Sequence, residues 1–466
     1  MNTQGFVEAD EIRTRFSRAM SDMYKQEVPL YGTLMELVAE TNSTVMESDK
    51  AVYDHLQRTG EIERLDMERH GAIRVGTPEE LATIARLFAV MGMQPVGYYD
   101  LTPAGVPVHS TAFRAIHEDS LQASPFRVFT SLLRLDLIEN EEIRQRVQAI
   151  LDQRQIFTPD ALKLIEKFET NGGLDAKDAA DFVEQALETF RWHHDATVTA
   201  KDYQRLHDQH RLIADVVAFK GPHINHLTPR TLDIDMIQNG MQQKGITPKA
   251  VIEGPPRRRC PILLRQTSFK ALQETVAFTD QDGIATGSHT ARFGEIEQRG
   301  AALTPKGREL YDSLLNAARA ELGEFPSESN AEKYTAILEK HFKDFPDDYA
   351  ELHDKGLAYF RYFPTQKGIA SRSNGHRPSS RQELIAQGHI QYEPLVYEDF
   401  LPVSAAGIFQ SNLGDDSQAH YAGSSNQAEF EKALGQKVTN ELKLYADTQR
   451  RSLLDCSTIL AVSPLV

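Results

Sequence analysis

Hydrophobic residues recur at helical spacing through the first part of the chain. Phe16, Met20 and Met23 fall on one face of a predicted helix over residues 6–24. The same spacing resumes in a second stretch before the pattern changes. Residues 1–66 are therefore predicted to form an N-terminal helical segment.

The spacing changes near His70, where a run of apolar residues is typical of a strand. Thr77 then provides a helix N-cap, with proline at the first helical position and Glu80 three residues on, and Gly92 ends this helix. Three further strand-like runs follow, at residues 95–99, 106–116 and 126–135. Residues 67–138 are therefore predicted to form a βαβββ module.

The same order of elements returns later in the chain, after a charged helical insertion predicted over residues 139–218. Thr228 and Pro229 are predicted to open the helix of this second unit, as Thr77 and its proline do in the first. The strands predicted here run over residues 223–227, 250–252, 261–269 and 289–298. Residues 219–303 are therefore predicted to be a second βαβββ module.

Two copies of one unit indicate a duplicated module. We predict an α+β fold in which the two βαβββ modules form a half-open barrel around a central cavity, surrounded by helical segments. One spacing does not match this scheme. His70 lies seven residues before Thr77, whereas His226 lies only two residues before Thr228.

The last part of the chain, residues 304–466, is predicted to be a helical region. Thr304 starts one helix, and further helices are predicted over residues 331–342 and 427–444. Between them, residues 395–410 combine apolar and small side chains. This composition predicts a loop that presents its backbone over a site.

The charge of the chain limits the partners that it can have. Its 67 acidic residues outnumber 51 basic ones, which gives a net charge of −16. Such a chain is soluble, and its acidity argues against nucleic acid as a partner. The basic cluster Arg257-Arg258-Arg259 follows two prolines and is interpreted as a strand entry or a local carboxylate site.

Cysteine content and apolar runs indicate the compartment. Cys260 and Cys456 lie in unrelated contexts, which predicts a reducing environment without a disulfide framework. The first residues lack the features of a signal peptide, and no apolar run approaches the ~18 residues that a membrane span needs. We therefore expect a cytoplasmic protein without a membrane partner.

Two histidine-bearing stretches and one acidic stretch carry the candidate chemistry. They are residues 69–74, 219–230 and 292–297. Two histidines and one carboxylate form the ligand set that suits an open, non-haem Fe(II) centre. Side chains alternate along a strand, so His223 and His226 would point opposite ways, whereas Glu295 and Glu297 would share a face. The residues alone leave both choices open.

Arg74 is a candidate for binding an acid. It lies four residues after His70 on the same face of the predicted strand, so their Cα atoms would be about 13 Å apart. A long arginine that reaches back could hold the far end of a small acid whose near end chelates a metal at His70. A guanidinium is the natural partner for such a carboxylate.

Each candidate also has a simpler interpretation. A lone strand histidine is usually a core or surface residue, and Glu295 could pair with Arg292 or Arg299. His117-Glu118-Asp119 matches the short H-x-D motif of jelly-roll oxygenases, but no β-rich chain of that kind surrounds it. Four further histidines in a charged helical stretch are interpreted as solvated: His193, His194, His207 and His210. No zinc-protease, dinucleotide or P-loop motif is present.

Together these stretches resemble the 2-oxoadipate dioxygenase/decarboxylases, also called 2-hydroxyglutarate synthases. The resemblance spans the full chain and rests on residues 69–74, 221–228 and 293–300 and on Pro402-Val403-Ser404. The core of this family is similar to the vicinal-oxygen-chelate fold, which agrees with the two predicted modules.

The resemblance implies a site and a reaction. It implies that His70, His226 and Glu295 bind Fe(II), and that Arg74 pairs with the distal carboxylate of the substrate. It also implies that the backbone of Val403 and the hydroxyl of Ser404 help to hold the acid. The implied reaction converts 2-oxoadipate and O2 to 2-hydroxyglutarate, expected in its R form, and CO2, in lysine catabolism. The alternatives are a non-oxidative metal-dependent lyase or isomerase of the same fold, and a non-catalytic metal- or ligand-binding protein.

Overall fold

The strands predicted for the first module lie in one sheet. The computed structural model describes residues 5–269, 273–280, 283–290, 292–324, 326–371, 380–401 and 426–465. The sheet contains β1 (Arg69–Val75), β2 (Gln94–Asp100), β3 (Val108–Arg114), β4 (Phe126–Leu133) and β5 (Leu227–Pro229), in the order β2-β3-β4-β1-β5. Helix α5 (Pro78–Val90) follows β1, and a short α6 (Glu118–Ala123) lies between β3 and β4. The predicted βαβββ order is confirmed.

Strand β1 lies between β4 and β5 in this sheet and is buried at every position. It pairs with β4 in parallel and with β5 in antiparallel orientation. The following helix is capped as predicted, since the side chain of Thr77 accepts a hydrogen bond from the backbone N–H of Glu80. Side chains on β1 are thus held on a rigid element inside the protein.

The second module continues the sheet from β5. Its further elements are α12 (Ile234–Gln243), β6 (Leu264–Ser268), β7 (Glu274–Asp280), β8 (Gly283–His289) and β9 (Glu295–Arg299). A bridge between Arg230 and Glu297 joins the end of β5 to β9, and β9 pairs with β6. Beyond β6, Glu253 bridges to Gln266. Starting from the β1–β5 contact, the order is β1-β4-β3-β2 in the first module and β5, β9, β6 and Glu253 in the second, so the two modules place corresponding strands in the same order. The strands form open sheets, not a closed barrel.

The helix of the second module begins later than predicted. Thr228 and Pro229 belong to β5, and the N-cap of α12 is Asp233, whose side chain accepts from the backbone N–H of Met236. The prediction that Thr228 opens the helix is therefore wrong. With the cap at Asp233, His226 lies seven residues before it, as His70 does before Thr77. The unequal spacing of the two modules thus disappears.

Three other strand predictions for this module differ from the structure. Residues 250–252 form no strand, although the neighbouring Pro248 and Glu253 make isolated bridges. The run over 289–298 is broken between β8 and β9, and the run over 223–227 reaches a strand only at Leu227. Hairpin β7–β8 is inserted between the paired strands β6 and β9. Alternation of side chains could not reveal these breaks, because they depend on which partner strand is present.

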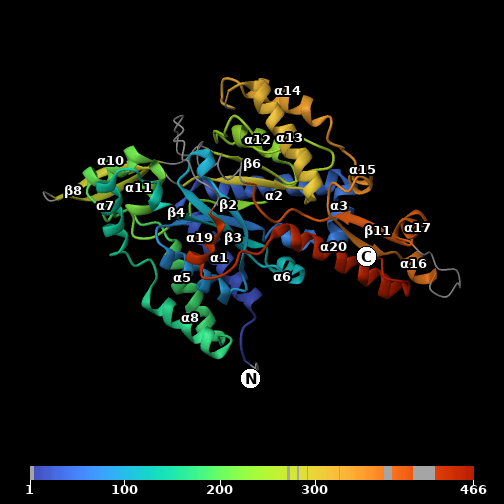
Figure 1. Cartoon of the computed structure of the whole chain (residues 1–466), viewed down its shortest axis with the longest axis horizontal. Helices are drawn as coiled ribbons and strands as arrows, with labels where there is room; N and C mark the ends of the chain where they lie inside the picture. Colours follow the sequence, from blue (N-terminus) through green and yellow to red (C-terminus); the bar gives the residue numbers. More distant parts are fainter. Residues whose placement is uncertain are drawn as a thin grey trace.

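Helices surround the sheet (Figure 1). The N-terminal helices are α1 (Ala9–Glu27), α2 (Leu30–Ser48), α3 (Lys50–Thr59) and α4 (Glu61–Leu65). The insertion contains α7 (Glu141–Leu151), α8 (Pro159–Asn171), α9 (Ala176–Leu187), α10 (Ala200–Gln209) and α11 (Arg211–Val217). The C-terminal region contains α13 (Pro305–Leu322), α14 (Ala331–Phe342), α15 (Tyr349–Asp354), α16 (Gln366–Ala370), α17 (Arg381–Ala386), α19 (Gln427–Leu434) and α20 (Glu441–Leu460). The segment boundaries proposed from the sequence stay predictions.

Helix α1 covers the first module through aromatic contacts. The ring of Phe16 lies edge-on to Phe126 on β4 and to Phe190 of the insertion, at centroid distances of 5.8 and 5.4 Å. Further along α1, the hydroxyl of Tyr24 donates to the backbone carbonyls of Phe293 and Asn225, at 2.7 and 3.1 Å. The N-terminal segment therefore holds in place the two chain stretches that lead into β5 and β9.

The C-terminal region contains a strand pair that the sequence pattern did not indicate. Strands β10 (Phe360–Pro364) and β11 (Ile390–Pro394) pair in antiparallel orientation beside α20. Residues 395–401 run back toward the sheet without regular structure, whereas the remainder of the predicted loop, with Val403 and Ser404, lies outside the described residues. None of the helices that the structure describes has both the length and the apolar character of a membrane span.

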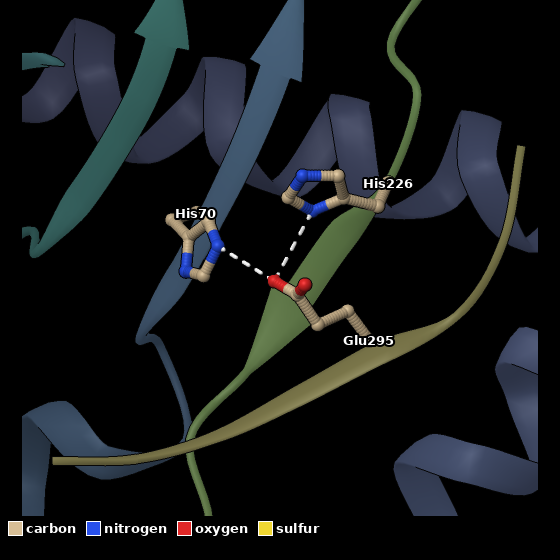
Figure 2. A group of neighbouring side chains, drawn as sticks. All are labelled: His70, His226 and Glu295. Atoms are coloured by element: carbon tan, nitrogen blue, oxygen red, sulfur yellow. Dashed lines mark hydrogen bonds and ion pairs between the residues drawn. The ribbon is translucent and has the colours of Figure 1, made fainter. Parts of the chain in front are cut away.

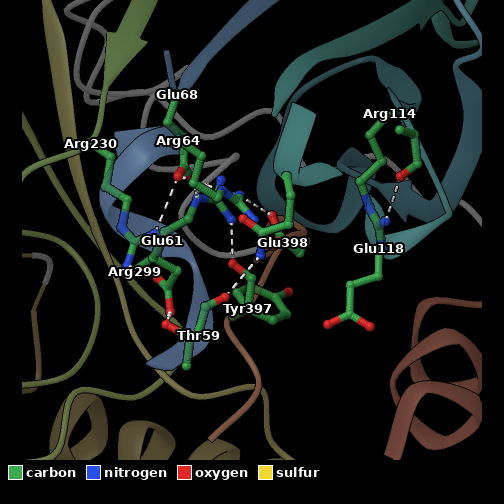
Figure 3. A network of polar contacts seen from close by, with 12 residues as sticks. Thr59, Glu61, Arg64, Glu68, Arg114, Glu118, Arg230, Arg299, Tyr397 and Glu398 are labelled. Carbon is green, nitrogen blue, oxygen red and sulfur yellow. Dashed lines mark hydrogen bonds and ion pairs between the residues drawn. The ribbon is translucent and has the colours of Figure 1, made fainter. Parts of the chain in front are cut away.

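A network of buried ion pairs joins the N-terminal helices to both modules (Figure 3). Glu68, which is fully buried, lies 2.8 Å from Arg127 on β4, 3.2 Å from Arg230 after β5 and 3.3 Å from Arg64 on α4. Arg64 also binds Glu398 of the segment after β11, at 2.8 Å. Truncating one partner of such a pair leaves an uncompensated buried charge.

We expect this network to make the protein acid-sensitive. Burial raises the pKa of Glu68, but Arg64, Arg230 and Arg127 outweigh it and lower the pKa from 4.5 to about 2. The ionised carboxylate therefore contributes its full stabilisation above pH 4.5, and this contribution is lost as the pH falls toward 2. Denaturant titrations between pH 3 and pH 6 should show the free energy of unfolding falling with acidity. Glu68→Gln should flatten this slope, and should lower stability at pH 7 by about 3–5 kcal/mol; an unchanged slope would contradict the assignment.

Candidate metal centre

Three buried side chains from separate parts of the chain meet where the two modules join. His70 lies on β1, His226 directly precedes β5, and Glu295 is the first residue of β9. Each has one potential ligand atom within 4.8 Å of those of the other two. Figure 2 shows both imidazoles directed at Glu295, whose Oε1 lies 3.0 Å from His70 Nε2 and 3.6 Å from His226 Nδ1.

Local backbone contacts explain why His226 reaches β1. His70 and Thr228 face each other in the β1–β5 pairing, and the backbone N–H of Asn225 donates to the carbonyl of Ala72. Gly71 permits this approach, since a Cβ there would lie 2.4 Å from Ile224 and 3.2 Å from the carbonyl oxygen of His226.

Polar neighbours fix the orientation of the three side chains. Glu297 Oε2 lies 2.9 Å from His70 Nδ1, on the side of the ring opposite Glu295. Thr228 Oγ1 lies 2.9 Å from His226 Nδ1 and donates to Glu295 Oε1 at 2.9 Å. A carboxylate on the second nitrogen of a histidine is the usual support for a metal ligand, because it fixes the ring and leaves the other nitrogen for the metal.

The charge states of the group suit a bound cation. Burial lowers the pKa of His226 to about 4, so its imidazole is neutral at pH 7 and free to coordinate. Burial raises the pKa of Glu295, but His226 and His70 outweigh it and keep the carboxylate ionised. Burial also lowers the pKa of His70, yet the carboxylates of Glu297 and Glu295 outweigh it and raise the pKa. The surroundings of His70 thus favour a positive charge, which a metal ion would supply.

The charge balance of these side chains favours a bound dication. Besides the two histidines, Glu295 accepts hydrogen bonds from Thr228 and from Gln266 Nε2, the latter at 3.1 Å. In the described part of the chain, no lysine or arginine forms an ion pair with Glu295. A buried carboxylate requires compensating positive charge. Two nitrogen ligands and one oxygen ligand fit the triad used by non-haem iron oxygenases.

A second buried group lies nearby and was not predicted. Asp215 on α11, His223 and His289 at the end of β8 also bring their ligand atoms within 4.8 Å of one another. His223 therefore belongs to a different group from His226, in agreement with the prediction that the two point in different directions. Strand alternation is not the cause, because residues 222–226 form no strand. The sequence around Asp215 and around His289 contains no motif that indicates a site, so neither residue could be predicted from its neighbours.

Comparison with known proteins identifies the family. The family described as 2-oxoadipate dioxygenase/decarboxylase matches residues 16–412. The chain belongs to this family. A relative of that name from Pseudomonas putida is 69% identical over 460 residues, which is 99% of each chain, and one from Escherichia coli is 55% identical over 453 residues, covering 97% of this chain and 99% of the relative. The family predicted from the sequence is therefore confirmed.

Solved structures agree with this membership. A crystal structure of the hydroxyglutarate synthase in complex with 2-oxoadipate from Pseudomonas putida matches with a TM-score of 0.92 and 66% identity, covering 98% of this chain and 100% of that one. A crystal structure from Shigella flexneri, of a protein described as uncharacterized, matches with a TM-score of 0.85 and 52% identity over 97% of this chain and 100% of that one. The fold of this family member is thus shared along nearly its whole length.

The other residues that the sequence singled out in this family member, Arg74 and His117, lie outside the three-residue group. Arg74 is buried on β1, and its Nη1 lies 2.5 Å from Asp215 Oδ2. His117 is exposed and precedes α6, away from the three-residue group. The suggestion that Glu295 pairs with Arg292 or Arg299 is wrong, since Arg292 pairs with Glu274 and Arg299 pairs with Glu297.

We expect Glu297→Gln to weaken metal binding in this family member. An amide cannot supply the negative charge that supports His70, and loss of such a partner typically costs about 10- to 100-fold in metal affinity or activity. Competition with a chromophoric chelator would measure the dissociation constant of the bound divalent cation. Glu80→Gln is a matched control, because it removes a buried carboxylate that pairs with Arg154. Equal affinities for the two variants would contradict the role of Glu297.

Proposed function

We propose that this chain is an Fe(II)-dependent dioxygenase/decarboxylase that converts 2-oxoadipate and O2 to 2-hydroxyglutarate and CO2. The observation that supports it most strongly is the buried pair of histidines with one carboxylate that has no lysine or arginine partner among the described residues. The names of the relatives and the 2-oxoadipate complex of the Pseudomonas putida protein agree with this activity. We expect the R product.

In this proposal His70, His226 and Glu295 hold the metal. When bound, Fe(II) supplies a Lewis acid and the redox chemistry that O2 requires. Because the protein would supply only three ligands, the metal would keep coordination positions open for a chelating substrate. The chain itself orients the keto acid and excludes water, since each of the three residues is at most 4% exposed.

Arg74 is proposed to bind the distal carboxylate of the substrate. It lies four residues after His70 on β1, so their Cα atoms are about 13 Å apart and both side chains leave the same face of the strand. A side chain that reaches back over this distance leaves room for a short dicarboxylic acid. Val403 and Ser404 are proposed to hold the acid from the loop that follows Leu401.

Unpartnered polar atoms next to the metal ligands support a ligand site. The side-chain amide of Asn225, before His226, is fully buried without a hydrogen-bond partner among the described residues. So is the hydroxyl of Ser268, which faces Glu295 in the β6–β9 pairing. Buried polar groups are nearly always hydrogen-bonded, so these atoms are suited to partners such as water or substrate.

The test is reconstitution with Fe(II) without oxygen, followed by addition of 2-oxoadipate and O2. We expect equal amounts of O2 consumed, CO2 released and 2-hydroxyglutarate formed, and both atoms of labelled oxygen in the 2-hydroxyglutarate. Product formation without O2 would instead indicate a metal-dependent lyase or isomerase. Binding of 2-oxoadipate without any product would indicate a non-catalytic binding protein.

We further propose that the reaction takes place in the cytoplasm, as a step of lysine breakdown. Cys260 and Cys456 are both buried and free, as in proteins of reducing compartments. Fractionation of cells that produce the full chain would locate it, and recovery in an oxidising compartment would contradict this proposal.

A further inference from the structure

A chain of buried polar contacts leads from Arg74 to the helical insertion. Asp215 Oδ2 binds Arg74, and Asp215 Oδ1 lies 2.9 Å from Nε2 of His289. The other ring nitrogen of His289 lies 2.8 Å from the hydroxyl of Tyr203 on α10. Every member is at most 8% exposed. Such an extended chain of contacts fixes the position of the guanidinium more firmly than one ion pair would.

His223 lies against the same carboxylate but is incompletely bonded. Its Nε2 makes a long contact of 3.2 Å with Asp215 Oδ1, and its Nδ1 has no hydrogen-bond partner within the described ranges. The ring is 2% exposed and is held by Trp192, whose centroid lies 4.7 Å away. A buried ring nitrogen without a hydrogen-bond partner is uncommon, and a bound ligand could provide the missing acceptor or donor.

Charge argues that this group binds an anion, not a second metal. Asp215 is already paired with the guanidinium of Arg74, so a dication at Asp215 would lie beside a fixed positive charge. The guanidinium of Arg292 stacks on Trp192 and lowers the pKa of His223, while Glu27 and Glu274 pair with that guanidinium. At Glu295, by contrast, the described side chains bring only histidines and neutral donors. The two groups have similar ligand atoms, but among the described residues only Asp215, and not Glu295, pairs with an arginine.

We propose that His223 is a second substrate-binding residue, which donates to the distal carboxylate beside Arg74. Asp215, held by His289 and Tyr203, positions both donors. This inference rests on the proposed function, because it takes the distal carboxylate to be bound at Arg74. With the acid bound, His223 carries a proton taken from solvent and donates through both nitrogens, one to Asp215 and one to the substrate. Two cations then face two carboxylates, and the buried subsite is neutral.

The groups that face His223 are few among the described residues. Asp215 and His289 lie within the same group, and Arg74 contacts the second carboxylate oxygen of Asp215. The other charged or titratable groups nearby are His193 and Arg292, and Arg292 pairs with Glu27 and Glu274. Burial lowers the pKa of His223 in the absence of a ligand, so the ring is neutral until a second carboxylate arrives. Binding of the dicarboxylic acid should therefore weaken as the pH rises above neutrality.

The test compares two acids of equal carbon number, 2-oxoadipate and 2-oxohexanoate, of which only the first has a distal carboxylate. In the iron-loaded enzyme, His223→Ala should raise KM for 2-oxoadipate about 10- to 100-fold, the value of one hydrogen bond to a charged group. It should leave kcat, iron content and the KM for 2-oxohexanoate unchanged. His223→Gln, which keeps one donor, should recover part of the loss and abolish the pH dependence of KM. An equal loss for both acids, or an unchanged KM for 2-oxoadipate, would overturn the proposal.

Two measurements keep this outcome separate from the proposed function. Anaerobic titration with 2-oxoadipate reports binding without turnover, so a wild-type enzyme that binds the acid but forms no product contradicts the function alone. Metal analysis should give one ion per chain in the wild type and in the His223→Ala/His289→Ala double variant. A second ion that is lost in the double variant would establish a metal site there and overturn the inference. Thermal melting checks the fold, and if the double variant is unfolded, His289→Gln replaces it.

Discussion

His226→Ala is expected to reduce turnover of 2-oxoadipate more than about 100-fold and to lower the iron content of the purified protein. Loss of a residue that only supports a metal ligand typically costs about 10- to 100-fold, and loss of a direct ligand should cost more. His226 is suited to be a ligand because burial lowers its pKa to about 4 and its ring faces Glu295. Elemental analysis and a product assay on the same sample would measure both effects.

His117→Ala is the matched control, since it removes an exposed histidine that precedes α6. It should keep full iron content and activity. If His226→Ala retained its iron while losing activity, His226 would act on the substrate instead of the metal. If it retained both, the proposed metal centre would be wrong.

Arg74→Ala is expected to raise KM for 2-oxoadipate roughly 30-fold or more, with little change in iron affinity. Truncating one partner of a buried charge pair costs about 2–5 kcal/mol, and every 1.4 kcal/mol is tenfold in binding. The variant also leaves Asp215 without its guanidinium, so part of the loss should appear as lower thermal stability. Steady-state kinetics, iron titration and thermal melting would separate these effects.

Arg86→Ala is the control for this prediction, because Arg86 pairs with Glu169 at the surface and both side chains are exposed. Its removal should change neither KM nor stability by a measurable amount. Arg74→Lys should keep the charge but lose the paired N–H donors of the guanidinium. Its KM for 2-oxoadipate should therefore lie between those of the wild type and Arg74→Ala. An unchanged KM in Arg74→Ala would show that the distal carboxylate binds elsewhere.

The first module followed from local signals. Thr77, Pro78 and Glu80 carry the information for a capped helix, and the buried strands around it stand out as separate apolar runs. The second module was harder to predict, because Thr228-Pro229 has the composition of a helix start but lies in a strand paired with β1. Here a tertiary partner overrides a local preference.

The insertion shows the same limit for function. Residues 139–218 are charged and helical, and nothing in their pattern indicates a site. The fold places Asp215 and Tyr203 against His289 from the β7–β8 hairpin, which lies beside the insertion through the bridge between Asp195 and Ala277. These contacts join residues far apart along the chain, so no window of sequence contains them.

The sequence by itself determined the family, the βαβββ order of the first module and the short list of histidines and carboxylates suited to a metal. Each of these depends on neighbouring residues or on motifs of a few positions. The family resemblance named His70, His226 and Glu295 as one set, but only the tertiary structure showed that they meet and that His223 lies with Asp215 and Arg74. The reason is physical: a metal or carboxylate site is a property of charges and distances across paired strands, which spacing along one strand does not contain.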